Sequence, residues 1–388
     1  MNLKEKVFSK FPVWCFIVFA AMCLLHYFSL RPLWLDEQFI LNNIQDYNYV
    51  QVFGPLKNLQ AFPRVYLVVV KAFSQAFDYH LLSLRFFSLV FMLGAFVIWI
   101  KLYQRQWQDK VGIFLSILSF TVSYQLVYYS AELKPYSMDV LAVGLFCLFF
   151  YYQQQFVSKS PTAWLYCTSI LLPFLIFFSY AGCFVFWMVG YNFIILIRDN
   201  KKLIPVFLVN AAVSLLCLAL LYFIDLRHGM YMNGFYQYWK NYFLGINSFT
   251  AFITPFGEAL KEIGTWWYGN TKLLIRMATP FLPLLVFSLA KYGFGGWKKN
   301  GWGIFTIPRM FGVLFVELII LSICHKYPFT GDRITLFLAP FVFYMIVKGI
   351  DSLRKIKILH AICFGYYLFF LGVCLVSSFL HYLSLYKQ

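Results

Sequence analysis

Long apolar runs, separated by short polar segments, dominate the pattern of this 388-residue chain. An α-helix needs about 20 consecutive apolar residues to cross a bilayer, within a range of about 17–25. By that criterion the sequence predicts about eleven transmembrane helices, starting near Phe11, Leu81, Val111, Tyr136, Ala163, Gly182, Leu203, Lys272, Gly303, Arg333 and Ile358. We interpret residues 11–30 as a retained first span and not as a cleaved signal peptide, because no small-residue cleavage site follows the run.

The basic residues between the runs predict the orientation of the chain. With a cytoplasmic N-terminus, every predicted cytoplasmic segment is basic, as the positive-inside rule requires. The residues concerned are Lys4, Lys6, Lys10, Lys101, Arg105, Lys110, Lys159, Arg198, Lys201, Lys202, Lys291, Lys298, Lys299, Lys348, Arg354, Lys355 and Lys357. Most acids fall on the other side: Asp36, Glu37, Asp46, Asp78, Glu132, Asp225, Glu258, Glu262 and Asp332. We expect an integral protein of a bacterial inner membrane.

Two long segments, 31–80 and 225–271, lie on the predicted extracytoplasmic side. The stretch "FPRVYLVVVKAFSQAF" (62–77) has an apolar face at helical spacing, but it is too short and polar to span. It predicts a helix in the membrane interface. The aromatic stretches 236–249 and 265–268 predict further structure resting on the lipid headgroups.

Composition excludes several other classes of protein. The chain is 62% hydrophobic and 12% charged, which is too apolar for a soluble domain. The formal charge of +17 is scattered between apolar runs, so we do not expect a nucleic-acid partner. The nine cysteines form no CxxC pair, and no histidine cluster has metal-ligand spacing.

The acidic pair in "LWLDEQF" (33–39) follows the first span directly. One reading is that Asp36 and Glu37 only cap the following helix, since acids are favourable at a helix N-terminus. The other reading is that they face a site at the membrane surface. The local sequence alone leaves both open.

Two further polar clusters fall on the same predicted side. Glu132 and Lys134 lie on the short connector of "YYSAELKPYSMDV" (128–140), either as a mutually screened surface pair or at the mouth of a site. His325, Lys326 and Arg333 surround a turn between two late spans. Such cations either anchor the chain to lipid headgroups or bind a phosphate.

Together the three clusters predict a sugar transfer from a phosphate-linked donor. A carboxylate would take the proton of the acceptor hydroxyl, and cations would neutralise the departing phosphate. Phosphate leaves readily as an anion, so no strong general acid is required.

The same segments carry a resemblance to a known family. "LWLDEQF" resembles the acidic first-loop motif of GT-C glycosyltransferases, in the branch related to protein O-mannosyltransferases and aminoarabinose transferases. "YYSAELKPYSMDVL" and "YPFTGDRITLFLAP" (327–340) resemble two other segments of that branch. The resemblance implies an all-α polytopic membrane protein with a GT-C-like fold, interfacial helices in the first extracytoplasmic loop, and a polyprenyl-phosphate-sugar donor. The whole chain, 1–388, would form one transmembrane domain without a separate soluble domain.

Residue by residue, the resemblance implies Asp36 as catalytic base, in a reaction that inverts the anomeric carbon. Glu37 would contact substrate or a metal, and Glu132 would be a second acid facing the cavity. The implied phosphate ligands are Lys134 and Arg333, helped by His325 or Lys326. Some relatives use a divalent cation such as Mg²⁺ or Mn²⁺, for which Asp36 and Glu37 are the only candidate ligands.

Two other functions stay open. A transporter or flippase of lipid-linked sugars would also be polytopic, although it would more often carry ionisable residues along the middle of several spans. A non-catalytic relative that binds only a lipid or partner is the third alternative. The sugar and the acceptor, whether glycan, lipid or protein, cannot be read from these residues.

Overall fold

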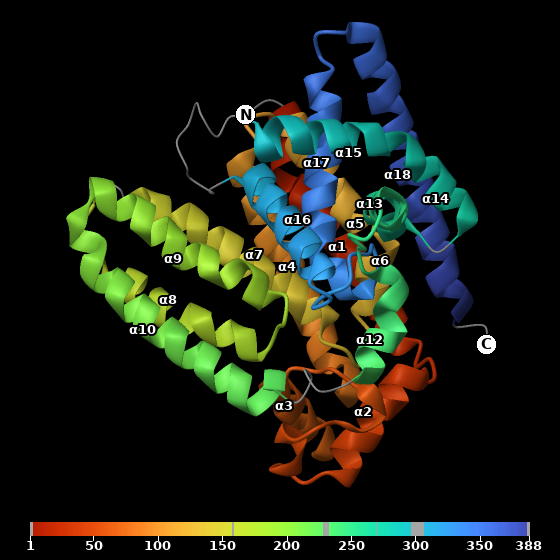
Figure 1. The fold of residues 1–388 in the computed structure, drawn as a ribbon. Helices are drawn as coiled ribbons and strands as arrows, with labels where there is room; N and C mark the ends of the chain where they lie inside the picture. Colours follow the sequence, from red (N-terminus) through yellow and green to blue (C-terminus); the bar gives the residue numbers. More distant parts are fainter. Residues whose placement is uncertain (1–2, 157–158, 228–232, 270, 296–305, 386–388) are drawn as a thin grey trace.

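The computed structural model describes residues 3–156, 159–227, 233–269, 271–295 and 306–385, and this part of the chain is helical without strands (Figure 1). Its α-helices are α1 (Leu3–Phe28), α2 (Leu35–Asp46), α3 (Arg64–Gln75), α4 (Leu81–Gln106), α5 (Lys110–Thr121), α6 (Tyr124–Tyr129), α7 (Tyr136–Gln153), α8 (Ala163–Leu171), α9 (Gly182–Asp199), α10 (Ile204–Leu221), α12 (Asn233–Trp239), α13 (Phe249–Thr265), α14 (Lys272–Ala278), α15 (Leu282–Ser288), α16 (Ile307–Ile323), α17 (Ala339–Ser352) and α18 (Lys357–Ser384). Short 3-10 turns such as η4 (Leu172–Phe177), η8 (Trp266–Tyr268) and η11 (Arg333–Leu338) extend or join them.

Eight helical stretches in the described part are long and apolar enough to cross a membrane, so the chain is an integral membrane protein. They are Lys10–Phe28, Leu81–Gln106, Tyr136–Phe156, Gly182–Asp199, Lys201–Leu226, Lys272–Phe294, Arg333–Ser352 and Lys357–Ser384. The other three predicted runs form shorter helical stretches, at α5, at α8 with η4, and at α16. The predicted start near Gly303 lies outside the described residues. The count of eleven spans therefore stays a prediction.

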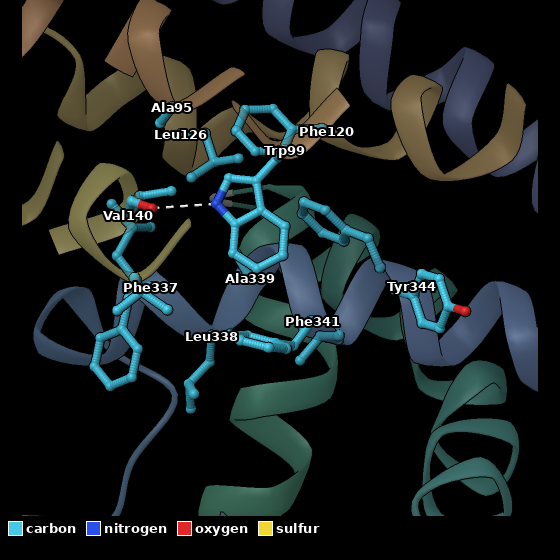
Figure 2. Close-up of a cluster of buried hydrophobic side chains, with 14 of the residues drawn as sticks. Ala95, Trp99, Phe120, Leu126, Val140, Phe337, Leu338, Ala339, Phe341 and Tyr344 are labelled. Atoms are coloured by element: carbon cyan, nitrogen blue, oxygen red, sulfur yellow. Dashed lines mark hydrogen bonds between the residues drawn. The ribbon is translucent and has the colours of Figure 1, made fainter. Parts of the chain in front are cut away.

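The core lies where α4, α7 and α17 pack together, around the fully buried Trp99 (Figure 2). The Trp99 indole donates a hydrogen bond of 3.1 Å to the carbonyl of Val140 and stacks edge-on against Phe341, with ring centroids 5.0 Å apart. Gly144 of α7 faces this indole, and a Cβ there would lie 2.9 Å from Trp99 Nε1. A residue without a side chain therefore lets α4 and α7 approach closely.

Residues 31–80, the first of the two long segments between predicted spans, fold over one end of the bundle. Figure 1 shows α2 and α3 at this end and the connection between α17 and α18 at the opposite end. The predicted helix over 62–77 is confirmed as α3, which buries Tyr66, Leu67 and Val70. Its placement in a membrane interface stays a prediction.

A buried polar contact ties α3 to the far end of α10. The backbone amide of Arg64 donates to Asp225 Oδ2 at 3.2 Å, and its Nε lies 3.6 Å from Asp225 Oδ1. The Tyr180 hydroxyl donates to the same carboxylate at 2.8 Å. These contacts join Asp225 to Tyr180, 45 positions away, and to Arg64, 161 positions away, and so hold the start of α3 against the α8–α10 layer (Figure 1).

Candidate functional site

The acidic pair lies in the first turn of α2, which begins directly after the extended residue Trp34. The two carboxylates point into different surroundings. The Asp36 side chain keeps 22% of its surface exposed, whereas the Glu37 side chain is completely buried. Consecutive residues of a helix point about 100° apart, which explains how neighbours reach such different partners.

Glu37 is saturated by contacts within the protein. Its carboxylate accepts two hydrogen bonds from Arg85, at 3.0 and 2.9 Å, and one from Arg31 at 3.0 Å. The backbone amides of Leu133 and Trp34 donate to it at 2.8 and 3.3 Å. A buried charge is tolerated only when it is paired and hydrogen-bonded in this way. Glu37 also caps the start of α2, and its predicted contact with substrate or a metal stays a prediction.

Asp36 instead forms an ion pair with Arg333, in the turn that precedes α17. Its Oδ2 lies 2.9 Å from Arg333 Nη2, and the Arg333 guanidinium stacks over Trp34 at 4.7 Å from the ring centroid. Arg333 opens η11, whose N-cap Asp332 accepts from the Arg333 amide at 2.6 Å. The first and last of the three predicted clusters therefore touch directly.

The turn that carries Arg333 is held by α13, in the long segment 225–271. Glu262 Oε2 accepts from the Thr330 hydroxyl at 2.7 Å and from the Gly331 amide at 3.3 Å. A Cβ on Gly331 would lie 2.2 Å from the Glu262 carbonyl carbon and the Ile263 amide nitrogen. Only glycine fits this close approach, so Gly331 and Glu262 together fix the position of Arg333.

The connector between α6 and α7 brings the second cluster to the same place. Glu132 Oε1 lies 3.3 Å from Arg31 Nη2, so Arg31 bridges Glu132 and Glu37. Lys134 Nζ donates to Gln60 Oε1 at 2.7 Å. Burial, and then the charge of Glu37, raises the pKa of Glu132 to about 8. Burial also lowers the pKa of Lys134, likewise to about 8.

A cavity of about 350 Å³ opens beside these groups. Its walls are mostly aromatic, and its lining residues are Trp34, Tyr124, Gln125, Tyr128, Tyr129 and Glu132. We call it the aromatic cavity. Glu132 Oε2 and Trp34 Nε1 are both buried, and no described residue forms a hydrogen bond with either atom.

The remaining two predicted phosphate ligands lie elsewhere. His325 and Lys326 are both exposed, and the His325 ring packs against the stacked rings of Tyr236 and Phe243, with centroids 5.5 and 5.3 Å away. Within the described ranges, no contact joins either residue to Asp36 or Arg333. The chain turns sharply here, because His325 adopts a left-handed backbone with a φ of 56°. We therefore assign neither residue to the site.

Three site residues escaped the sequence analysis: Arg31, Arg85 and Glu262. Arg85 had a usable signal, because an arginine one turn inside a predicted span needs a buried acidic partner. Arg31 pairs with Glu37 six positions away, but its bridge to Glu132 spans 101 positions, and the partners of Glu262 lie 68 and 69 positions away, so the local sequence did not reveal these contacts.

The residues of this site do not fit a divalent metal. Both Glu37 oxygens are engaged by arginines or amides, and Asp36 is paired with Arg333. Among the residues that the structure describes, no three His, Cys, Asp or Glu side chains form a possible metal-binding group. Hard cations such as Mg²⁺ require several oxygen ligands, so we derive no step through a metal.

The helices of the described residues and the likeness to a solved structure show an all-α polytopic membrane fold with a GT-C-like architecture, which confirms the predicted fold class apart from its helix count. Among solved structures, the chain is similar to that of ArnT from Cupriavidus metallidurans bound to undecaprenyl phosphate. The TM-score is 0.50 at 12% sequence identity, over 87% of this chain and 60% of that one. This chain thus spans less than two thirds of the length of ArnT. No protein-family model matches the chain, and no curated protein matches it significantly.

Proposed function

We propose that the protein is a membrane glycosyltransferase, which moves a sugar from a polyprenyl-phosphate donor to an acceptor hydroxyl at the extracytoplasmic face. The observation that carries the proposal is the direct pairing of Asp36 with Arg333 at 2.9 Å, beside Lys134, Glu132 and the aromatic cavity. One partly exposed carboxylate and two cations are the groups that this transfer needs. The fold shared with ArnT, whose structure contains undecaprenyl phosphate, supports a lipid-linked donor.

In the proposed reaction, Asp36 takes the proton of the acceptor hydroxyl as its oxygen attacks the anomeric carbon. The bond between that carbon and the phosphate oxygen breaks, and polyprenyl phosphate leaves with the bonding electron pair. Attack from the face opposite the leaving group inverts the anomeric carbon. Arg333 and Lys134 stabilise the charge of the leaving phosphate, and Asp36 returns its proton to water.

The ion pair between Asp36 and Arg333 implies that the donor, besides supplying the sugar, also frees the catalytic base. While Asp36 Oδ2 is paired with Arg333, this oxygen already has a hydrogen-bond partner and is not free for the hydroxyl of an acceptor. An arriving phosphate competes for Arg333, since guanidinium groups bind phosphate in a fork geometry. Donor binding would thus release Asp36 just when an acceptor can use it.

Glu37 takes no part in these steps. With Arg31 and Arg85 it joins the start of α2 to the connector that bears Glu132 and Lys134. This buried cluster holds Asp36 and the phosphate-binding cations at a fixed separation, which catalysis by positioning requires.

The experiment compares sugar transfer by the parent protein and by Asp36→Asn, both purified in nanodiscs and supplied with a panel of undecaprenyl-phosphate-linked sugars and acceptors. Asparagine keeps the shape but cannot accept the proton, so turnover should fall by about 10²–10⁴-fold. Asp46→Asn is the matched control, because Asp46 belongs to the same helix but forms an exposed pair with Lys57. Full turnover by Asp36→Asn would end the assignment, and transmembrane movement of the intact donor without transfer would favour a flippase.

A further inference from the structure

The aromatic cavity has the size and the walls of a site for a single sugar ring. Ligand pockets in proteins usually measure about 300–1,000 Å³, and this one lies at the lower end of that range. The rings of Tyr128 and Tyr129 meet edge to face with centroids 5.2 Å apart, and Tyr124 is stacked with Tyr128 at 5.9 Å. These rings give the cavity an aromatic wall, which the C–H bonds of a sugar can contact. The cavity is too small for a polyprenyl chain.

Two buried polar atoms at the cavity wall still lack partners. Glu132 Oε2 and Trp34 Nε1 form no hydrogen bond with any described residue, and the Glu132 side chain is only 1% exposed. The indole N–H can only donate, so its partner must accept a hydrogen bond. A sugar hydroxyl can accept from Trp34 and donate to Glu132, whereas an ammonium group could donate to Glu132 but could not accept from Trp34.

The charges around the cavity oppose a cationic ligand. The guanidinium of Arg31 lies 5.1 Å from the Tyr128 ring centroid, and that of Arg333 lies 4.7 Å from that of Trp34. Two aromatic walls therefore already face cations of the protein, which would repel a third.

We propose that the aromatic cavity binds the ring of the transferred sugar, and that this sugar is uncharged, with hydroxyl groups and no protonated amine. The inference rests on the proposed function and specifies its donor. The position agrees with a phosphate held by Arg333 and Lys134, because Glu132 and Trp34 border the cavity within two residues of Lys134 and Asp36. The anomeric carbon would then lie between the phosphate-binding cations and the base.

The test measures the affinity of the protein in nanodiscs for three probes. These are undecaprenyl phosphate, the same lipid phosphate bearing a neutral hexose, and the lipid phosphate bearing the matching 2-amino-2-deoxyhexose. The neutral sugar should tighten binding at least about tenfold relative to undecaprenyl phosphate, an increment within the range of aromatic stacking and hydrogen bonding. The amino sugar should give no gain at a pH at which its amine is protonated.

Two variants test whether the gain in affinity from the neutral sugar arises in the aromatic cavity. Tyr128→Leu removes one stacking wall, and Trp34→Phe removes the indole donor while keeping an aromatic ring; each should abolish or reduce the gain from the neutral sugar. Tyr238→Leu, at an exposed tyrosine of α12, is the control and should keep it. An equal or larger gain from the amino sugar would overturn the inference, as would a gain that survives both variants. Failure to bind undecaprenyl phosphate itself would instead overturn the proposed function, and this inference with it.

Discussion

Asp36 and Glu37 are neighbours in the chain, yet the structure gives them opposite surroundings. Asp36 has one cationic partner, Arg333, and keeps part of its surface open. Glu37 has two arginine partners and two amide donors and is closed to solvent. The comparison teaches that the acid with fewer contacts is the one suited to proton transfer, because it can exchange its partner at low cost. The fully satisfied acid is suited to hold the site together.

The largest expected effect on stability comes from the buried member of the pair. Glu37→Gln leaves the charges of Arg31 and Arg85 only partly compensated, and breaking a buried pair costs about 3–5 kcal/mol of unfolding free energy. Thermal or denaturant unfolding in detergent would measure the loss. Asp36→Asn should remain close to the parent, because its pair is partly exposed. Equal losses in both variants would remove the distinction between the two acids.

Arg333→Ala removes the cationic partner of Asp36 and tests whether this arginine binds the donor phosphate. Loss of one charge-assisted contact should weaken the binding of undecaprenyl phosphate by about 1.5–3 kcal/mol. Equilibrium binding in nanodiscs would measure it, with Lys326→Ala as the matched control because Lys326 is an exposed cation of the same connector. If both variants bound the lipid as tightly as the parent, Arg333 would lose its proposed role.

The smallest effect is a pH dependence of donor binding. At pH 7, with both pKa values near 8, Glu132 is mostly protonated and Lys134 is mostly charged. Raising the pH through 8 adds a negative charge at Glu132 and removes a positive charge at Lys134, so the KM for the donor should rise. Between pH 7 and 9 the rise should be about tenfold if one group controls binding and about a hundredfold if both do.

Glu132→Gln cannot ionise and isolates the contribution of Lys134. In this variant the rise between pH 7 and 9 should not exceed about tenfold, and Lys134→Arg, which stays charged, should flatten the remaining part. A KM that is independent of pH in the parent protein would contradict the predicted ionisation of both residues.

Much of the architecture could be predicted because apolar length and helical periodicity are properties of local sequence. The eleven apolar runs correspond to helical stretches, and the amphipathic run at 62–77 forms α3. The meeting of Asp36, Glu132 and Arg333 at one end of the bundle could also be expected from sidedness, because a membrane confines polar connectors to two surfaces.

The individual hydrogen bonds and ion pairs of the site could not be predicted from the sequence. His325 and Lys326 are close to Arg333 in the chain, but both are exposed, and the His325 ring packs against Tyr236 and Phe243. Arg85 and Glu262 reach the site from distant segments through buried pairs and backbone contacts. Such long-range contacts depend on how the helices pack. The spacing of hydrophobic residues predicts the helices but does not predict which polar residues come into contact when they pack.

The central claim is that Arg333 exchanges Asp36 for the phosphate of a lipid-linked donor. A cryo-electron microscopy structure of the protein in nanodiscs with undecaprenyl phosphate tests it most directly. We predict density for the phosphate within hydrogen-bond distance of both Arg333 and Lys134, with the Asp36 carboxylate released and facing the aromatic cavity. Lipid phosphate bound elsewhere, with Arg333 still paired to Asp36, would contradict the account.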